Sequence, residues 1–288
     1  MNIINLPDIL IGTRVPEYND VIFYYHVSDD VDYRTKITFN SHCITLLLSG
    51  KKHIIVGDKN FFYDRNSCLL FKSGNYLSTK IAPTDKPYHS ILIFFNSTAL
   101  ERIRHKYQDL CNHSNSKLSI QNKISISTDS YLDNFKTTIK EIFHDNSTFS
   151  SRLQLIKFEE IMLYLLEQYG KSVIDFFKTP TSYSNESMFK KIIEKNIFNL
   201  STIEEMAFLC NMSISTFKRV FFDLYRVSPG KWIREKRLEK SAYLIGVHKK
   251  NPSEIYEEMG FSSLSSFSQS FKKRFGIAPK QYKTRGKF

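Results

Sequence analysis

STIEEMAFLCNMSISTFKRVFFDLYRVSPGKW (residues 201–232) and NPSEIYEEMGFSSLSSFSQSFKKRFGIAPKQY (residues 251–282) are two copies of one pattern, fifty residues apart. The matched positions are Ser213 and Ser263, Ser215 and Ser265, Phe217 and Phe267, Phe221 and Phe271, Pro229 and Pro279, and Trp232 and Tyr282. Apolar residues four apart predict, in each copy, an amphipathic helix that follows a short helix and a tight turn. Each copy therefore predicts a helix-turn-helix motif, which offers its second helix to a DNA groove.

Local signals place the two motifs at about 202–224 and 252–275. Thr202 followed by Glu205 has the spacing of a capping box, which begins a helix. Gly260 suits the left-handed backbone conformation that commonly ends a helix. Pro229 predicts a further helix at about 230–246, because proline is favoured in a first turn. This linker helix would let the two motifs enter major-groove segments about 34 Å apart.

The basic excess of the chain lies in the segment that contains the repeat. Residues 187–288 hold 20 lysines and arginines against 9 aspartates and glutamates, a net charge of +11. Residues 1–186 hold 21 against 20, a net charge of +1. A solvated basic face is the plain alternative, but together with the repeat this charge indicates a phosphate-binding surface.

The N-terminal part predicts β-structure followed by helices, so the fold class is α+β. Short β-branched and aromatic runs separated by turn residues indicate an antiparallel sandwich or small barrel. The expected strands are 21–27, 43–48, 53–58, 61–63, 68–71 and 90–95, with a brief one at 124–127. The expected helices are 97–107, 130–144 and 151–169.

The helix at 151–169 carries a wide apolar stripe that could cover its own β-domain or contact a second subunit. Its candidate dimer-interface residues are Phe158, Met162, Leu165 and Tyr169. The domains are expected at 1–170 and 187–288, with a linker at 171–186 and a boundary near Ser184.

The outward side chains of the two second helices are the candidates for DNA contacts. Arg219 is the most specific candidate for a base contact in the first motif, because a guanidinium can donate two hydrogen bonds to guanine O6 and N7. The alternative for Arg219 is a phosphate contact or a surface ion pair. Gln269 in the second can bond adenine N6 and N7. The candidate base contacts are Ser215, Lys218, Arg219, Ser265, Ser268 and Gln269. The candidate phosphate contacts are Thr216, Ser263, Lys272, Lys273 and Arg274.

Residues 186–284 resemble the AraC/XylS family of bacterial transcription regulators. The resemblance rests on SISTFKRVF (213–221), SPGKWIREKRLEKSAYLI (228–245) and GFSSLSSFSQSFKKRFGIAPKQY (260–282). It implies a DNA-binding activator with the six base contacts named above. This sequence differs from the family pattern at two positions. Gln269 stands where many members have Arg, and Tyr256 stands where a small Ala is usual.

The segment LLLSGKKHIIVGDKNFFYDRNSCLLFKSG (46–74) is similar to the cupin-like regulatory domains of the same family. The resemblance implies control of residues 1–170 by a small-molecule effector or a regulatory protein. It also implies promoter DNA and RNA polymerase as partners. The apolar stripe at 151–169 makes a homodimer possible. No cofactor is expected.

Other function classes lack their motifs in this sequence. A metal-using or sugar-modifying cupin enzyme with an accessory nucleic-acid domain is the main alternative, but His26, His42, His53 and His89 form no His-x-His pair. An RNA-binding protein would need an RNP-type sheet motif, which is absent. The four cysteines lie far apart in the sequence, as expected of reduced thiols in a cytosolic protein. The sequence shows no long apolar stretch and no signal peptide. We therefore expect a cytoplasmic protein without a membrane span.

Overall fold

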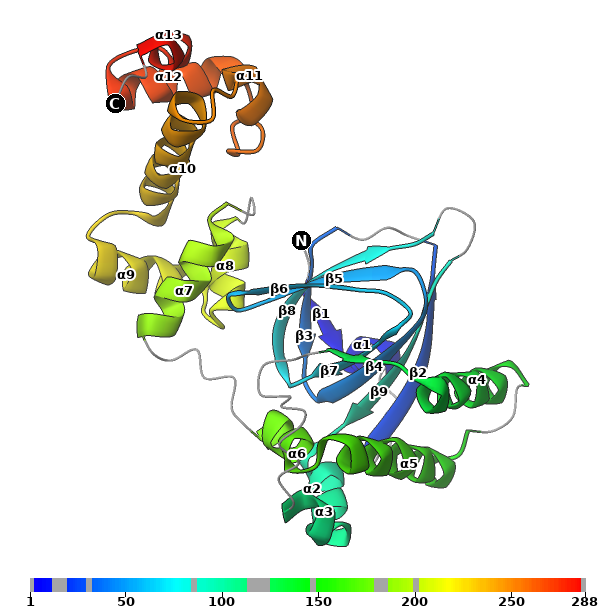
Figure 1. Ribbon diagram of the computed structural model, residues 1–288. Coiled ribbons are helices and arrows are strands. Elements are labelled where there is room, and N and C mark those ends of the chain that lie inside the picture. The colour runs from blue at the N-terminus through cyan, green and yellow to red at the C-terminus, as the bar shows by residue number, and fades with distance from the viewer. Residues whose placement is uncertain are drawn as a thin grey trace. The chain divides into compact units, whose positions relative to one another are not determined.

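The computed structural model describes residues 3–11, 20–29, 33–83, 87–112, 125–145, 149–178, 186–198 and 202–285 (Figure 1). The chain forms two compact units. The N-terminal unit comprises Met1–Val56 and Asn60–Ser182, and the C-terminal unit comprises Gly57–Lys59 and Tyr183–Phe288.

Two five-stranded sheets face each other in the N-terminal unit, which confirms the sandwich prediction. The outer sheet has the order β1 (Ile4–Leu6), β3 (Thr35–Phe39), β8 (Gly74–Ile81), β5 (Lys51–Val56) and β6 (Lys59–Tyr63). The central sheet has the order β10 (Ser125–Ser127), β7 (Ser67–Phe71), β4 (His42–Ser49), β9 (Tyr88–Phe95) and β2 (Val21–Ser28). Of these strands, β1, β3 and β8 are absent from the expected set.

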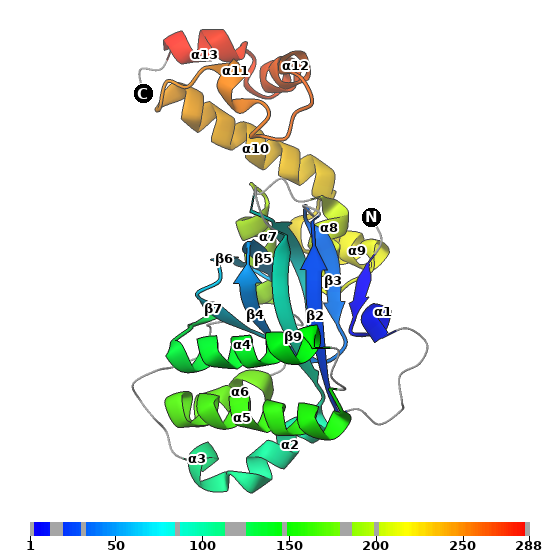
Figure 2. The same cartoon turned by 90° about the vertical axis from the view of Figure 1, so that its right-hand side faces the viewer.

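Helices cover the side of the central sheet that faces away from the outer sheet, and Figure 2 shows α4 and α5 lying across it. Along β4, Cys43 and Leu47 pack toward the outer sheet, whereas Ile44 and Leu46 pack toward the helices. Both faces of this sheet are therefore buried, which explains the nearly continuous apolar runs of β4 and β9. The helices of this unit are α1 (Asp8–Ile11), α2 (Ser97–Lys106), α3 (Gln108–Asn112), α4 (Ser130–His144), α5 (Ser151–Tyr169) and α6 (Lys171–Lys178).

The apolar stripe of α5 belongs to the core of its own unit. Phe158, Met162 and Leu165 are 2%, 0% and 0% exposed, and Tyr169 packs against the same cluster. Side chains buried within one chain cannot also form a subunit interface without unpacking it. Phe158, Met162 and Leu165 are therefore core residues of their own unit, whereas Tyr169 is only partly buried. The dimer interface stays a prediction, and α5 turns other residues outward, such as Ile156 at 61% exposed.

The expected linker begins too early. Residues 171–178 form α6, whose Val173, Ile174 and Phe177 are buried in the same core as the α5 stripe. Their apolar side chains favour a place in this core over a place in a linker. The rest of the expected linker, 179–185 with the boundary near Ser184, lies outside the described residues.

Apart from its short Gly57–Lys59 segment, the described part of the C-terminal unit consists of helices joined by turns, as predicted (Figure 1). It contains α7 (Glu186–Asn196), α8 (Ile203–Leu209), α9 (Ile214–Tyr225), α10 (Pro229–Gly246), α11 (Pro252–Ile255), α12 (Leu264–Phe275) and α13 (Pro279–Arg285). The long helix α10 joins the group formed by α7, α8 and α9 to the group formed by α11, α12 and α13. Across the described parts of both units, every helix is too short or too polar to cross a membrane.

Replacing Leu165 with Ala should lower the free energy of unfolding by about 2–5 kcal/mol, because it leaves a cavity in the core beneath α5. Leu155→Ala is the matched control, since Leu155 lies on the same helix and is 37% exposed; its effect should stay within about 1 kcal/mol. Urea unfolding measures both. A folded Leu165→Ala protein of wild-type stability that only dissociates in sedimentation would restore the interface assignment.

Candidate nucleic-acid interface

Local hydrogen bonds fix the start of both helices in the first motif. Thr202 Oγ1 accepts from the Glu205 amide at 3.1 Å, and the Thr202 amide donates to Glu205 Oε2 at 3.0 Å. This is the predicted capping box. Asn211 takes a left-handed conformation in the turn (φ 55°), and Ser213 Oγ then accepts from the Thr216 amide at 3.1 Å. The serine cap therefore sets where α9 begins.

The second motif uses the same devices, with a shorter first helix than predicted. Asn251 and Glu254 form a capping box at the start of α11, but the helix ends at Ile255 and continues as turns. Tyr256, one residue beyond, packs partly buried against the core of the second motif. Gly260 adopts the expected left-handed conformation (φ 74°), and Ser263 Oγ accepts from the Ser266 amide at 3.1 Å.

The repeat in the sequence appears in the structure as one aromatic contact made twice. The ring of Phe221 lies 5.6 Å from that of Trp232, at an interplanar angle of 75°. Fifty residues later, Phe271 lies 5.4 Å from Tyr282, at 82°. Both are edge-to-face arrangements, which aromatic pairs prefer. Each contact holds the inner face of α9 or α12, so the outer face is left for a ligand.

The outer face of α9 presents the residues predicted to contact bases. Ser215, Lys218 and Arg219 are exposed, and Thr216 is half-buried. Ser213 Oγ approaches the Ser215 hydroxyl at 3.0 Å and donates to Thr216 Oγ1 at 2.8 Å. Among the residues that the structure describes, no ion pair or hydrogen bond engages the side chains of Lys218 and Arg219. Both cations are therefore available to DNA.

The outer face of α12 is similar at its N-terminal end. Ser265 and Gln269 are exposed, and Ser268 is half-buried. Lys272 and Lys273 are exposed farther along. Arg274 differs from them, because its guanidinium lies 3.6 Å from Glu239 on α10 and over the ring of Phe275. Of the three predicted phosphate contacts on this helix, Arg274 is thus already engaged within the protein.

Phe222 is a surface residue that sequence reasoning missed. It lies on α9 with 52% of its surface exposed, seven residues after Ser215 and therefore on the same side of the helix. By the offset of fifty it takes the place of Lys272. The repeat could have revealed this difference: the first motif carries an apolar side chain where the second carries a cation.

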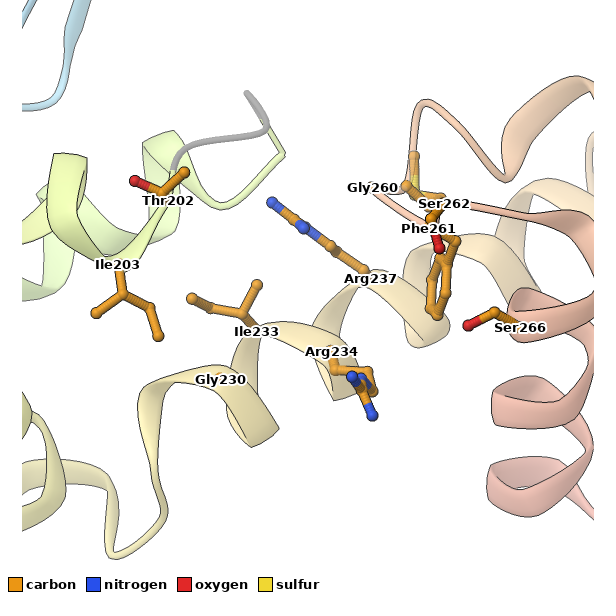
Figure 3. Close-up of a pocket in the computed structure, with 11 residues that line it drawn as sticks. Thr202, Ile203, Gly230, Ile233, Arg234, Arg237, Gly260, Phe261, Ser262 and Ser266 are labelled. Carbon is orange, nitrogen blue, oxygen red and sulfur yellow. The ribbon is translucent and has the colours of Figure 1, made fainter. Parts of the chain in front are cut away.

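A groove of about 350 Å³ runs along α10 between the two motifs (Figure 3). Arg234 and Arg237, one turn apart on α10, bring guanidinium groups to it. Thr202 and Ile203 line it from the first motif, and Ser266 from the second. Arg237 Nε donates to the Ile197 carbonyl at 3.0 Å, and burial lowers the pKa of this arginine. The groove joins residues far apart in sequence and was not predicted.

The groups needed for metal or thiol chemistry do not gather anywhere in the described residues. No cluster of three metal-binding side chains occurs there. Cys43, Cys68, Cys111 and Cys210 are all buried, and none of them forms a disulfide within the described residues. Burial raises the pKa of the Cys43, Cys68 and Cys210 thiols to about 12, so these three are not nucleophiles near neutral pH.

Comparison with known proteins finds matches to both units. Residues 42–176 match the family described as the ExsA N-terminal regulatory domain, and residues 206–285 match the Helix-turn-helix domain family. The chain belongs to the AraC/XylS family of transcriptional regulators. This family consists of transcription regulators, not enzymes.

Several relatives in the AraC/XylS family share this similarity. The virulence regulon transcriptional activator VirF of Yersinia enterocolitica is 32% identical over 139 residues, 48% of this chain and 51% of VirF. The regulator ExsA of Pseudomonas aeruginosa is 30% identical over 128 residues, 44% of this chain and 46% of ExsA. The chain thus matches about half the length of these relatives. A crystal structure of apo ToxT from Vibrio cholerae aligns with a TM-score of 0.42 and 14% identity, over 93% of this chain and 98% of ToxT.

Changing Arg219 to Ala should weaken DNA binding by about 1–3 kcal/mol and relax the preference at one base pair, because a base contact carries sequence information. Changing Lys272 to Ala should weaken binding to all sequences nearly equally, because a phosphate contact does not. Affinities for a panel of single-base variants of one bound site measure both effects.

The control for this comparison is Lys51→Ala, which removes one exposed positive charge from the N-terminal unit. This substitution should leave the affinities for all site variants of the panel unchanged. The same pattern of loss in Arg219→Ala and Lys272→Ala would show that the two kinds of contact are assigned wrongly.

Proposed function

We propose that the chain is a sequence-specific double-stranded DNA-binding transcription activator, controlled through its N-terminal unit. The observation that carries this proposal is the pair of recognition helices, α9 and α12. Each is held by a repeated aromatic contact and offers hydroxyl, amide or cationic side chains on its outer face. Family membership and the curated names of VirF and ExsA support it.

Ser215, Lys218 and Arg219 in the first motif are proposed to contact base edges, as are Ser265, Ser268 and Gln269 in the second. Thr216, Ser263, Lys272 and Lys273 are proposed to contact phosphates. Ser263 also caps α12, and a capping hydroxyl can still donate to a phosphate oxygen while it accepts from an amide. Arg274 would contribute only after leaving Glu239.

The groove along α10 adds a third set of phosphate contacts to this proposal. DNA that enters both motifs must carry its backbone past the surface between them. Arg234 is exposed there, and Arg237 brings a second cation one turn away. Guanidinium groups match phosphate geometry and bind it with two parallel hydrogen bonds. A phosphate between the two half-sites is therefore proposed to bind in this groove.

The proposed partners are promoter DNA and RNA polymerase, with a small-molecule effector or a regulatory protein at the N-terminal unit. The proposed location is the cytoplasm, where promoter DNA and RNA polymerase would be met. The homodimer stays a prediction, and its interface would have to use outward residues such as Ile156, not the buried stripe of α5.

Binding of the full chain to duplex DNA should weaken steeply as salt rises. Six to ten phosphate contacts would reduce affinity by about 10³–10⁵ between 50 and 200 mM salt, because bound cations displace condensed counterions. A gel-shift or anisotropy titration over this range measures the slope, first on DNA selected from a random pool. Undetectable binding, or binding insensitive to salt, would contradict the proposed function.

Arg234→Ala should reduce that salt slope by about one and weaken all sequences alike, as expected for one lost phosphate contact. Lys51→Ala again serves as the charge-matched control and should leave the slope unchanged. An unchanged slope in Arg234→Ala would exclude the groove from the interface while leaving the recognition helices untouched.

A further inference from the structure

The outer side of α9 carries one aromatic ring among cations. Phe222 is 52% exposed, and the exposed side chains of Lys218 and Arg219 lie one turn before it. With Ser215, these residues fall within a sector of about 100° around the helix axis. Arg226, also exposed, follows one turn after the ring as the C-cap of α9. The ring therefore has positive charge on both sides along the helix.

The core of the first motif does not account for the ring of Phe222. Its neighbour Phe221 is fully buried and contacts the rings of Phe217 and Trp232. Within the described part of the chain, no ring contact and no cation–π contact involves Phe222. Single exposed apolar residues are common on proteins, so only the surroundings of the ring can indicate a function.

The two motifs differ at this position and again one turn beyond it. By the offset of fifty, Lys272 stands in the place of Phe222, and Gly276 stands in the place of Arg226. The first motif therefore has a ring followed by a cation, whereas the second has a cation followed by a glycine. Each motif keeps one cation at the end of its recognition helix, and the first motif has moved it by one turn.

The displaced cation of the first motif lies on an unfavourable backbone. Arg226 takes the left-handed conformation (φ 55°), as Gly276 does at the matched position (φ 78°). Glycine adopts this conformation readily, but a residue with a Cβ atom is disfavoured in it. Among the described residues, no ion pair or hydrogen bond engages the Arg226 side chain and offsets this cost. A strained residue of this kind is typical of a binding surface.

The major groove of DNA offers the matching chemistry. Thymine is the base that presents an apolar group there, its C5 methyl, and this methyl lies beside the phosphates of its own strand. A ring with cations on both sides can contact the methyl while the cations meet the phosphates. An apolar protein surface over Phe222 would instead cover these cations without a counter-charge.

We propose that Phe222 is a specificity-determining residue that contacts the C5 methyl of one thymine, while Arg226 binds the neighbouring phosphate. The inference rests on the proposed function, because it requires α9 to lie in the major groove. Phe222 follows Arg219 by three residues, a rise of about 4.5 Å, against about 3.4 Å for one base-pair step. The thymine should therefore lie within two base pairs of the pair that Arg219 contacts.

Replacing the thymines of the selected site one at a time with deoxyuridine removes only the methyl group. The full wild-type chain should bind one such site about 3- to 10-fold less tightly, the loss expected for one buried methyl. Phe222→Ala should bind that site and the unsubstituted site equally, whereas Phe222→Leu should keep most of the difference. Fluorescence anisotropy measures each affinity.

The losses from Phe222→Ala and from methyl removal should thus fail to multiply at one thymine. Losses that multiply at every thymine would mean that the ring contacts something other than a methyl, and the proposal would be wrong. Coupling only to a thymine in the half-site of the second motif would contradict it equally.

Phe222→Lys copies the second motif into the first. It should abolish the methyl dependence and increase the salt slope of binding by about one, because a cation replaces the ring. Tyr243→Ala is the matched control, since Tyr243 is 56% exposed and lies nine residues after Arg234, on the opposite side of α10. The control should keep both the methyl dependence and the slope. A Phe222→Lys protein that still distinguishes the same methyl would overturn the proposal.

Arg226→Gly tests the phosphate contact, because glycine suits the left-handed backbone. This variant should melt at or above the wild-type temperature and lose about one unit of salt slope. An unchanged slope would remove Arg226 from the interface. If the wild-type chain binds no duplex, the proposed function fails together with this inference. Salt-dependent binding without any thymine coupled to Phe222 would refute this inference alone.

Discussion

The contacts of Phe221 with Trp232 and of Phe271 with Tyr282 are the constraint on which the DNA-binding surface depends. A recognition helix can offer a polar face to DNA only while its opposite face is held. Each motif is too small to bury many side chains, so a few rings supply most of its core. An edge-to-face pair adds about 0.5–1.5 kcal/mol beyond the area it buries. The side chains of Arg219 and Gln269 therefore stay exposed only because apolar residues on the opposite face of each helix hold that helix in place.

Features governed by neighbouring residues could be predicted from the sequence. The capping box of Thr202 and Glu205, the serine cap of α9 and the left-handed Gly260 all depend on contacts within a few residues. Both helix-turn-helix motifs could be predicted because the same pattern of residues occurs twice in the chain, fifty residues apart. The end of α11 was predicted less well, since the packing of Tyr256 against the second core ends the regular helix early.

Features that depend on distant parts of the chain could not be predicted in this way. The stripe of α5 has the same period whether it covers its own sheet or another subunit, and only the central sheet beneath it shows which. Helix α6 carries apolar residues beside a polar segment, and its place in the core follows from tertiary packing. The groove of Arg234 joins residues from three segments, so no single stretch indicates it.

Strand β8 escaped prediction for a different reason, and that reason connects sequence to function. Its inward positions include Ser78 and Lys80, so the apolar alternation that marks a half-buried strand is broken. A local rule that fails inside a well-packed domain often marks a functional site. Lys80 lies opposite Lys52 in the register of the outer sheet, so the place of this strand follows from its pairing and not from an apolar alternation.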